Sequence, residues 1–139
     1  MAKPLRAAVE DALVAYLTAQ SVATNIYPGF SASDKSAPCV VAEATSGEEE
    51  PMQSGNYKVT VRVVVKGLAA DGIDAFNTIC DATRDALQVD GLHDSLNAVA
   101  TDLTVFGVAS SNTISWATEE DCWTETTEVQ LYCCTQTFP

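Results

Sequence analysis

The sequence predicts an α+β fold: a mostly antiparallel β-sheet with two main helices packed on one of its faces. The first observation is a strict alternation at Tyr57–Val65, where apolar side chains lie between Lys58, Thr60 and Arg62. A period of two is typical of a half-buried strand. The second is a pair of amphipathic runs at helical spacing, and the third is another alternating run after Trp123. Their order along the chain is α-ββ-α-ββ.

The chain length predicts one domain over residues 1–139. A domain of this size buries roughly 68–70% of the surface that its unfolded chain exposes. That is enough for a core without metals or disulfides.

The first helix is predicted from about Pro4 to Gln20, because apolar residues recur there at steps of three and four. Proline suits a first helical turn, where its missing N–H costs nothing. Glu10 and Asp11 are expected on the solvated side of this helix. The next segment, Ser21 to Lys35, is expected to be a loop, with a short strand at Asn25 to Tyr27.

The first hairpin is predicted from a strand at Ala37–Ala44, a tip at Gly47–Gly55 and a second strand at Gly55–Gly67. The tip carries three consecutive carboxylates, Glu48, Glu49 and Glu50, and like charges in a row disfavour compact packing. The tip is either a plain solvated turn or an arm that becomes ordered only against a partner.

The second helix is predicted from Asp71, as its N-cap, to about Val89, where Asp90-Gly91 ends it. Leu92, Leu96 and Val99 then indicate a short helix before residue 102.

The second hairpin joins a strand at Leu103–Ala117 to a strand at Trp123–Thr135 through an acidic turn. The first of these strands is irregular around Ala109–Asn112. The turn consists of Glu119, Glu120 and Asp121. With the helices on one face, the other face of the sheet is expected to carry polar side chains, namely Lys58, Thr60, Arg62, Glu128 and Gln130.

The charge balance excludes a protein that binds nucleic acid through its surface charge. The chain has 19 acidic and 7 basic residues, a formal net charge of −12. Binding to phosphates requires clusters of Lys and Arg. The acidic surface serves either solubility alone or a channel wall that DNA passes without sticking.

The sequence indicates a cytoplasmic origin. No apolar run resembles a signal peptide or approaches the roughly 20 residues that span a bilayer. The five cysteines, at 39, 80, 122, 133 and 134, contain no C-x-x-C spacing. We interpret them as reduced, buried small hydrophobes, with no disulfide or metal role.

The motifs do not predict an enzyme, a cofactor or a metal site. His93 lies beside Asp94 and Ser95, a short run that occurs often by chance. No phosphate-binding glycine motif is present. Trp116 and Trp123 flank the acidic turn and could stack a ligand, although packing against each other across the strands is the preferred interpretation.

The chain resembles the small neck and tail-completion proteins of long-tailed bacteriophages, and the tail terminator most of all. The resemblance covers the first helix, then Asn25-Ile26-Tyr27-Pro28-Gly29, Ala37-Pro38-Cys39-Val40-Val41 and Ser54-Gly55-Asn56-Tyr57-Lys58-Val59-Thr60-Val61. The helix at 71–89 and the strand at 123–131 follow in the same order as in that family.

This resemblance implies a structural virion protein without an active site or cofactor. Such proteins form a ring, usually of six copies, which caps the tail tube and joins it to the head–tail connector, and DNA passes through the lumen. The mixed-charge sheet face would then meet neighbouring subunits, and the hairpin tips would reach the tube or the connector. The protein-interface residues expected on this basis are Glu48, Glu49, Glu50, Lys58, Arg62, Glu119, Glu120 and Asp121.

Three alternatives stay open at this point. The chain could be another neck, connector or tail tube subunit of the same virion. It could be a small cytoplasmic accessory or ligand-binding domain. A small enzyme would need His93 or a cysteine in its chemistry.

Overall fold

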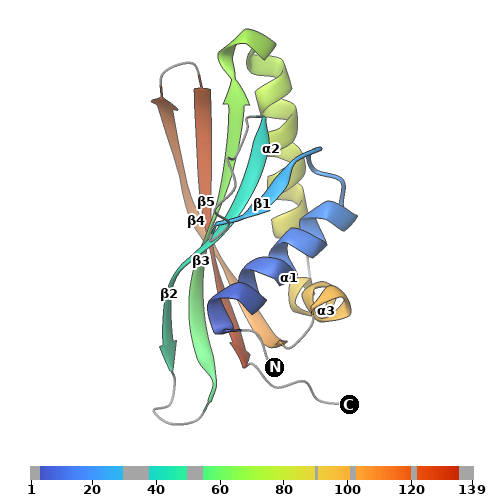
Figure 1. The fold of residues 1–139 in the computed structure, drawn as a ribbon, viewed down its shortest axis with the longest axis vertical. Helices are drawn as coiled ribbons and strands as arrows, with labels where there is room; N and C mark the ends of the chain where they lie inside the picture. Colours follow the sequence, from blue (N-terminus) through green and yellow to red (C-terminus); the bar gives the residue numbers. More distant parts are fainter. Residues whose placement is uncertain are drawn as a thin grey trace.

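The computed structural model describes residues 4–29, 38–49, 55–89, 91–100, 103–119 and 122–134. Within these ranges it contains three α-helices and one five-stranded sheet, and Figure 1 shows all the helices on one side of that sheet. The predicted α+β class is therefore confirmed. The helices are α1 (Leu5–Ala19), α2 (Ile73–Leu87) and α3 (Leu92–Val99). The strands are β1 (Ile26–Pro28), β2 (Cys39–Glu49), β3 (Tyr57–Leu68), β4 (Thr104–Glu119) and β5 (Cys122–Cys134).

The sheet has the strand order β1-β2-β3-β5-β4. All pairs are antiparallel except β1 with β2, which is parallel and spans only Val40 to Ala42 of β2. The two long hairpins therefore meet at the centre, where β3 of the first pairs with β5 of the second. Their free ends point to opposite ends of the molecule (Figure 1).

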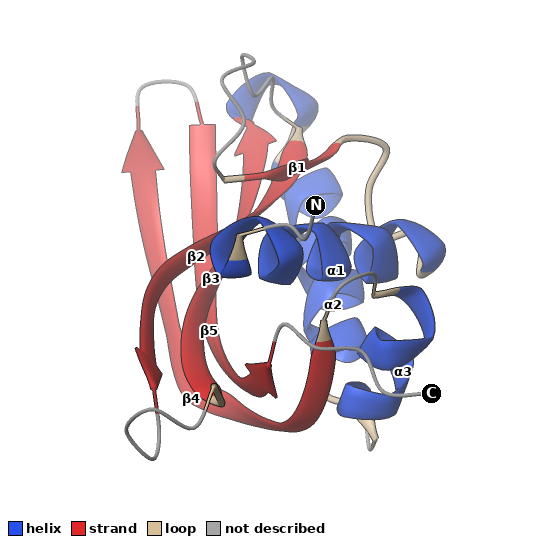
Figure 2. Ribbon diagram, turned by 60° about the horizontal axis from the view of Figure 1, so that its bottom comes forward, coloured by secondary structure: helices blue, strands red, loops and turns tan. Residues whose placement is uncertain are grey.

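The core lies between the sheet and the helix layer (Figure 2). The four alternating valines of β3 are at most 2% exposed, as the period of two predicts. The α1 residues Leu13 and Leu17 and the α3 residue Leu96 are fully buried against that face. Tyr16 ties α1 to α2 because its hydroxyl donates a 2.6 Å hydrogen bond to the Ala86 carbonyl.

Helix α2 begins later than the sequence predicts. Residues Ala69–Asp71 form a 3₁₀ turn, and Gly72 is the N-cap, at φ 90°. A positive φ of this kind favours glycine, so the chain turns at Gly72, and Asp71 makes no capping hydrogen bond. The predicted end near Val89 is close to the observed Leu87, and the short helix at Leu92–Val99 is confirmed.

Strand β2 is longer than predicted. Gly47, Glu48 and Glu49 pair with Val59, Lys58 and Tyr57, so they belong to the ladder and not to a hairpin tip. A bulge between Ala44 and Ser46 adds one residue and shifts the alternation of side chains. A search for a period of two in the sequence therefore ends the strand too early. In β4, the register shift between Ser110 and Ile114 confirms the predicted irregularity.

Candidate assembly surfaces

The helix-free face of the sheet, called the open face below, carries the polar residues that the sequence places there. Lys58 lies opposite Glu48 on one side and Tyr132 on the other, and Arg62 lies between Glu43 and Glu128. Directly opposite residues of an antiparallel pair point to the same face. On β2, β3 and β5, the charged side chains of the open face are thus three cations and three carboxylates, namely Lys58, Arg62, Lys66, Glu43, Glu48 and Glu128.

Over β2, β3 and β5 the charges of the open face sum to zero, although the chain is strongly acidic. Subtracting its three cations and three carboxylates leaves 16 acidic and 4 basic residues elsewhere, so the rest of the chain carries the whole charge of −12. Two copies of this protein therefore meet the least electrostatic repulsion where this face takes part.

The predicted interface residues do not form one patch. Glu48, Lys58 and Arg62 share the open face, whereas Glu49 lies on the opposite side of β2, across from Tyr57. The Glu49 carboxylate accepts a 2.9 Å hydrogen bond from the backbone N–H of Gly55, which ties the two strand ends together. Glu119 is the last residue of β4. Glu50, Glu120 and Asp121 lie outside the described residues.

The outer edge of β4 is a surface that the sequence analysis missed. β5 pairs with its inner side, and no strand in the described part of the chain pairs with its outer side. An edge strand is commonly protected by charges or proline. The sequence from Leu103 to Thr118 contains neither, and this is the signal that could have identified the edge in advance.

Near its start, β4 is protected by α3. The Asn97 side chain donates to the Val105 carbonyl at 2.9 Å and accepts from the Val105 N–H at 2.7 Å. A backbone bulge follows and leaves Phe106 half exposed. The unprotected part of the edge therefore lies between this bulge and the end of the strand.

Trp116 projects from this unprotected part, on the helix side of the sheet. It is 71% exposed, yet its indole N–H donates a 2.9 Å hydrogen bond to the Glu125 carboxylate on the neighbouring strand. Glu125 is only 3% exposed and also accepts from Arg84 of α2 at 3.1 Å. The indole is thus held in a fixed orientation while most of its surface faces solvent.

The expected packing of Trp116 against Trp123 is wrong. The register places Trp116 opposite Glu125 and Trp123 opposite Thr118. The ring of Trp123 instead packs on Phe76 of α2, with ring centroids 6.0 Å apart. The two indoles are therefore diagonal neighbours, offset by two residues along the strands, and both line one pocket with Phe76 on the helix side of the sheet.

A second carboxylate is buried on the same helix side, near the opposite edge of the sheet. Glu10, expected on the solvated side of α1, is fully buried and accepts hydrogen bonds from the Ala44 N–H at 2.8 Å and from Arg6 at 3.2 Å. The Ala44 N–H lies at the outer edge of β2, just beyond the residues that pair with β1, and Glu10 supplies its acceptor. The expectation of a solvated Glu10 is corrected by this contact.

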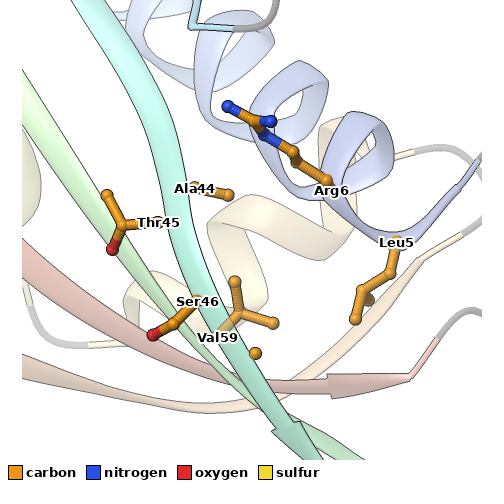
Figure 3. Close-up of a pocket in the computed structure, with 7 residues that line it drawn as sticks. Leu5, Arg6, Ala44, Thr45, Ser46 and Val59 are labelled. Atoms are coloured by element: carbon orange, nitrogen blue, oxygen red, sulfur yellow. The ribbon is translucent and has the colours of Figure 1, made fainter.

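A pocket of about 170 Å³ lies beside this contact, on the helix side of the outer part of β2 (Figure 3). Leu5 and Val59 form its apolar walls, and Arg6 stands at its rim. We call it the Leu5–Val59 pocket; its lining residues are Leu5, Arg6, Ala44, Thr45, Ser46, Gly47 and Val59.

The chemistry of the described residues offers no catalytic constellation. His93 is half exposed, and its ring nitrogen lies 3.4 Å from the Asp94 carboxylate beside it in the chain. Burial raises the pKa of the Cys80 thiol to about 12, with a further contribution from the nearby Glu125 charge. In the described ranges, no three His, Cys, Asp or Glu side chains are grouped so that they could hold a metal ion.

Among the described helices, none has the length and apolar character that a membrane crossing requires. The four cysteines at 39, 80, 133 and 134 are buried, and Cys122 is partly buried; all five are free thiols. Adjacent Cys133 and Cys134 point to opposite faces of β5, and both are covered.

Comparison with known proteins gives a structural likeness only. No protein-family model matches the chain, and no curated protein sequence matches it. A chain in the structure "Virion of native gene transfer agent (GTA) particle" aligns with a TM-score of 0.58, over 94% of each chain, at 18% sequence identity. At this identity the likeness shows that the two chains share a fold.

Proposed function

We propose that this chain is a non-enzymatic structural protein of a phage-like virion. The observation that carries the proposal is the fold, shared over 94% of both chains with a component of a gene transfer agent virion. Coverage of both chains is as important as similarity, because the likeness then includes the whole arrangement of hairpins and helices and not one common motif.

Within the virion, the proposed role is that of a tail terminator. Copies of the chain form a ring, of six copies, that caps the tail tube and joins it to the head–tail connector and adaptor proteins. The ring is assembled in the host cytoplasm and resides in the neck of the tail. This finer role rests on the resemblance seen in the sequence.

The hairpin arrangement supports a protein that bridges two partners. The β2–β3 and β4–β5 hairpins extend toward opposite ends of the molecule (Figure 1). In a ring, one hairpin from every copy can face the tube and the other can face the connector. We propose protein-interface roles for the residues of both hairpins that the sequence singles out: Glu48, Glu49, Glu50, Lys58, Arg62, Glu119, Glu120 and Asp121.

The charge distribution supports passage of DNA without binding. A chain of net charge −12 repels phosphates, and the three cations of the open face are matched there by three carboxylates. On the described strands of this face, DNA would therefore meet no unbalanced cationic cluster of the kind that a nucleic-acid-binding surface requires.

Capping of tail tubes tests the proposal. The purified protein is mixed with assembling tail tube protein of the same virion, and tube ends are imaged by negative-stain electron microscopy. The expected result is a ring at one end of each tube and an arrest of tube growth. Tubes that elongate normally and lack a terminal ring would contradict the terminator role.

Removing charge from the first hairpin tests its part in docking. Because Glu48 and Glu49 belong to the β2–β3 ladder, shortening the hairpin would damage the sheet. The variant Glu48→Gln/Glu50→Gln keeps the side-chain size and is expected to lower the fraction of capped tubes several-fold. Asp74→Asn/Asp85→Asn removes the same charge from exposed positions of α2 and is the matched control.

A further inference from the structure

We propose that copies of this chain join edge to edge, with Trp116 of one copy seated in the Leu5–Val59 pocket of the next. The contact pairs the outer edge of β4 with the outer edge of β2 beyond the bulge. The inference deepens the proposed function, because it names the contact that would build the ring, and it rests on that function. The occupant of the pocket is thus a second copy of the same chain.

The sheet has two free edges, and they complement each other. In the described residues, β1 pairs with β2 only at Val40 to Ala42, and Glu10 accepts the hydrogen bond of the Ala44 N–H. No described strand pairs with the outer edge of β2 from Thr45 to Glu48. This edge carries Glu48 and Glu49, whereas β4 from Thr104 to Thr118 carries no charge. Two β2 edges would repel each other, but a β2 edge and a β4 edge do not.

The strand directions favour repetition of this contact. Three successive antiparallel pairs separate β2 from β4, so the two strands run in opposite directions within one copy. A second copy in the same orientation therefore presents its β2 antiparallel to the first copy's β4, with both helix layers on the same side of the joined sheet. A head-to-tail contact of this type generates a ring when its rotation closes.

The side chains at the two edges match in shape and chemistry. Trp116 and the Leu5–Val59 pocket both lie on the helix side of their strands. The pocket measures about 170 Å³, and an apolar cavity of about 150 Å³ suffices for an aromatic ring in another protein. Arg6 at the rim can stack on the indole face, an arrangement that favours tryptophan among the aromatic residues.

The hydrogen bond from Trp116 to Glu125 reduces the cost of docking. An exposed side chain normally loses rotamer freedom when a partner binds it. Here the Glu125–Arg84 pair already orients the indole before any partner arrives. A partly buried ion pair that orients a 71% exposed tryptophan is explained if the tryptophan is an interface residue.

The stagger of the contact fits a closed ring. When the paired residues are followed from β4 through β5 and β3 to β2, Trp116 lies level with Val40, whereas the pocket lies at Ala44–Gly47. Seating one in the other shifts the copies by about five residues, roughly 17 Å along the strands. Each copy contributes its four long strands, β2 to β5, which together span roughly 19 Å across the sheet. The resulting strand tilt of about 40° is within the range of closed barrels.

Two variants test the contact from its two sides. Trp116→Ala removes the inserted side chain, and Gly47→Ile fills the pocket of the receiving copy. A Cβ at Gly47 would lie 3.7 Å from Leu5 Cδ2 and from Val59 Cγ2, which is ordinary contact, so a side chain at this position begins inside the pocket without a clash. Phe106→Ala, a half-exposed aromatic residue near the start of the same strand, is the control.

The expected result is a loss of association of about 30-fold or more for each of the first two variants, measured by mass photometry, and little change for Phe106→Ala. Urea unfolding of each variant is the check that it folds, and a variant that does not fold is replaced by Trp116→Leu or Gly47→Val. An equimolar mixture of Trp116→Ala and Gly47→Ile gives dimers and nothing larger, because each variant retains the surface that the other lacks.

If Trp116→Ala or Gly47→Ile forms rings as readily as the wild type, the proposed contact is wrong, although the proposal of a ring is not contradicted. A mixture of the two variants that stays monomeric would also overturn it. A wild-type protein that is monomeric at every concentration, with and without tail tubes, would overturn the proposed function and this contact together.

Discussion

Two buried carboxylates show what individual residues do in this fold. Glu10 satisfies the edge of β2, and Glu125 positions Trp116 on the edge of β4. A buried carboxylate is tolerated where hydrogen bonds and a cation replace its water. Helical periodicity placed Glu10 toward solvent, because nothing in α1 reveals that the unpaired Ala44 N–H of a distant strand lies beside it.

Replacing Glu10 by Ala is expected to lower the free energy of unfolding by about 1–3 kcal/mol. The cost comes chiefly from the Ala44 N–H, which loses its acceptor, since Arg6 is half exposed and regains water. Glu10→Gln keeps an oxygen for that N–H and is expected to cost less. Urea unfolding measures both, and an Ala variant as stable as the wild type would contradict the account.

The thiols of Cys80 and Cys133 are expected to be unreactive in the folded protein. Burial raises the pKa of each to about 12, so at pH 8 only about one thiol in ten thousand is the reactive thiolate. A thiol-specific reagent at pH 8 should therefore modify Cys122, which is partly exposed, and reach the four buried cysteines only after unfolding. Rapid modification of Cys80 in the native state would contradict this burial.

The thiols of Cys80 and Cys133 also predict how the free energy of unfolding changes in alkali. Below about pH 8 they are protonated in both states and contribute no pH dependence. Above the ordinary thiol pKa, near 8.5, the unfolded chain loses these protons and the folded chain keeps them until about pH 12. The free energy of unfolding should therefore fall between about pH 9 and pH 12, and Cys80→Ala should reduce that slope.

At the scale of elements, the alternation of side chains predicts most of the sheet. The four valines of β3 and the residues Val129, Leu131 and Cys133 of β5 all face the core, as the period of two requires. The prediction fails where a local irregularity interrupts the period. The bulge in β2 hides its last residues, and the 3₁₀ turn before Gly72 removes Asp71 from the helix start.

The packing of α2 on β3 depends on the absence of a side chain at Gly67. A Cβ there would lie 2.6 Å from Phe76 Cδ1, which no ordinary contact allows. Gly67→Ala is expected to lower the free energy of unfolding by about 1–3 kcal/mol through overpacking. Gly107→Ala, whose Cβ would lie 3.8 Å from Tyr132 Cδ2, is the matched control and should be nearly neutral.

At the scale of the whole molecule, the sequence located one candidate assembly surface and missed another. The mixed-charge face follows from alternation on β3 and β5 and is confirmed as the open face. The Leu5–Val59 pocket joins residues about 40 to 55 positions apart in the chain, and the orientation of Trp116 depends on Glu125 across the ladder. Contacts of this kind come from tertiary register, which a single sequence does not contain.

The net charge of −12 predicts how salt affects assembly. Copies of an acidic chain repel one another, and salt screens this repulsion as the Debye length falls from roughly 10 Å at 0.1 M to roughly 3 Å at 1 M. Association measured by sedimentation should therefore strengthen as salt is raised. Weaker association at high salt would indicate a contact built on ion pairs, contrary to the apolar contact at Trp116.

The central claim, that this chain forms a ring, is tested most directly by the mass and shape of the purified protein across a concentration series. Mass photometry with negative-stain imaging is predicted to show particles of six times the 14.7 kDa chain mass, with an open central pore. A twelve-fold ring would assign the chain to a connector on the head side. A protein that stays monomeric at every concentration and beside tail tubes would contradict the account.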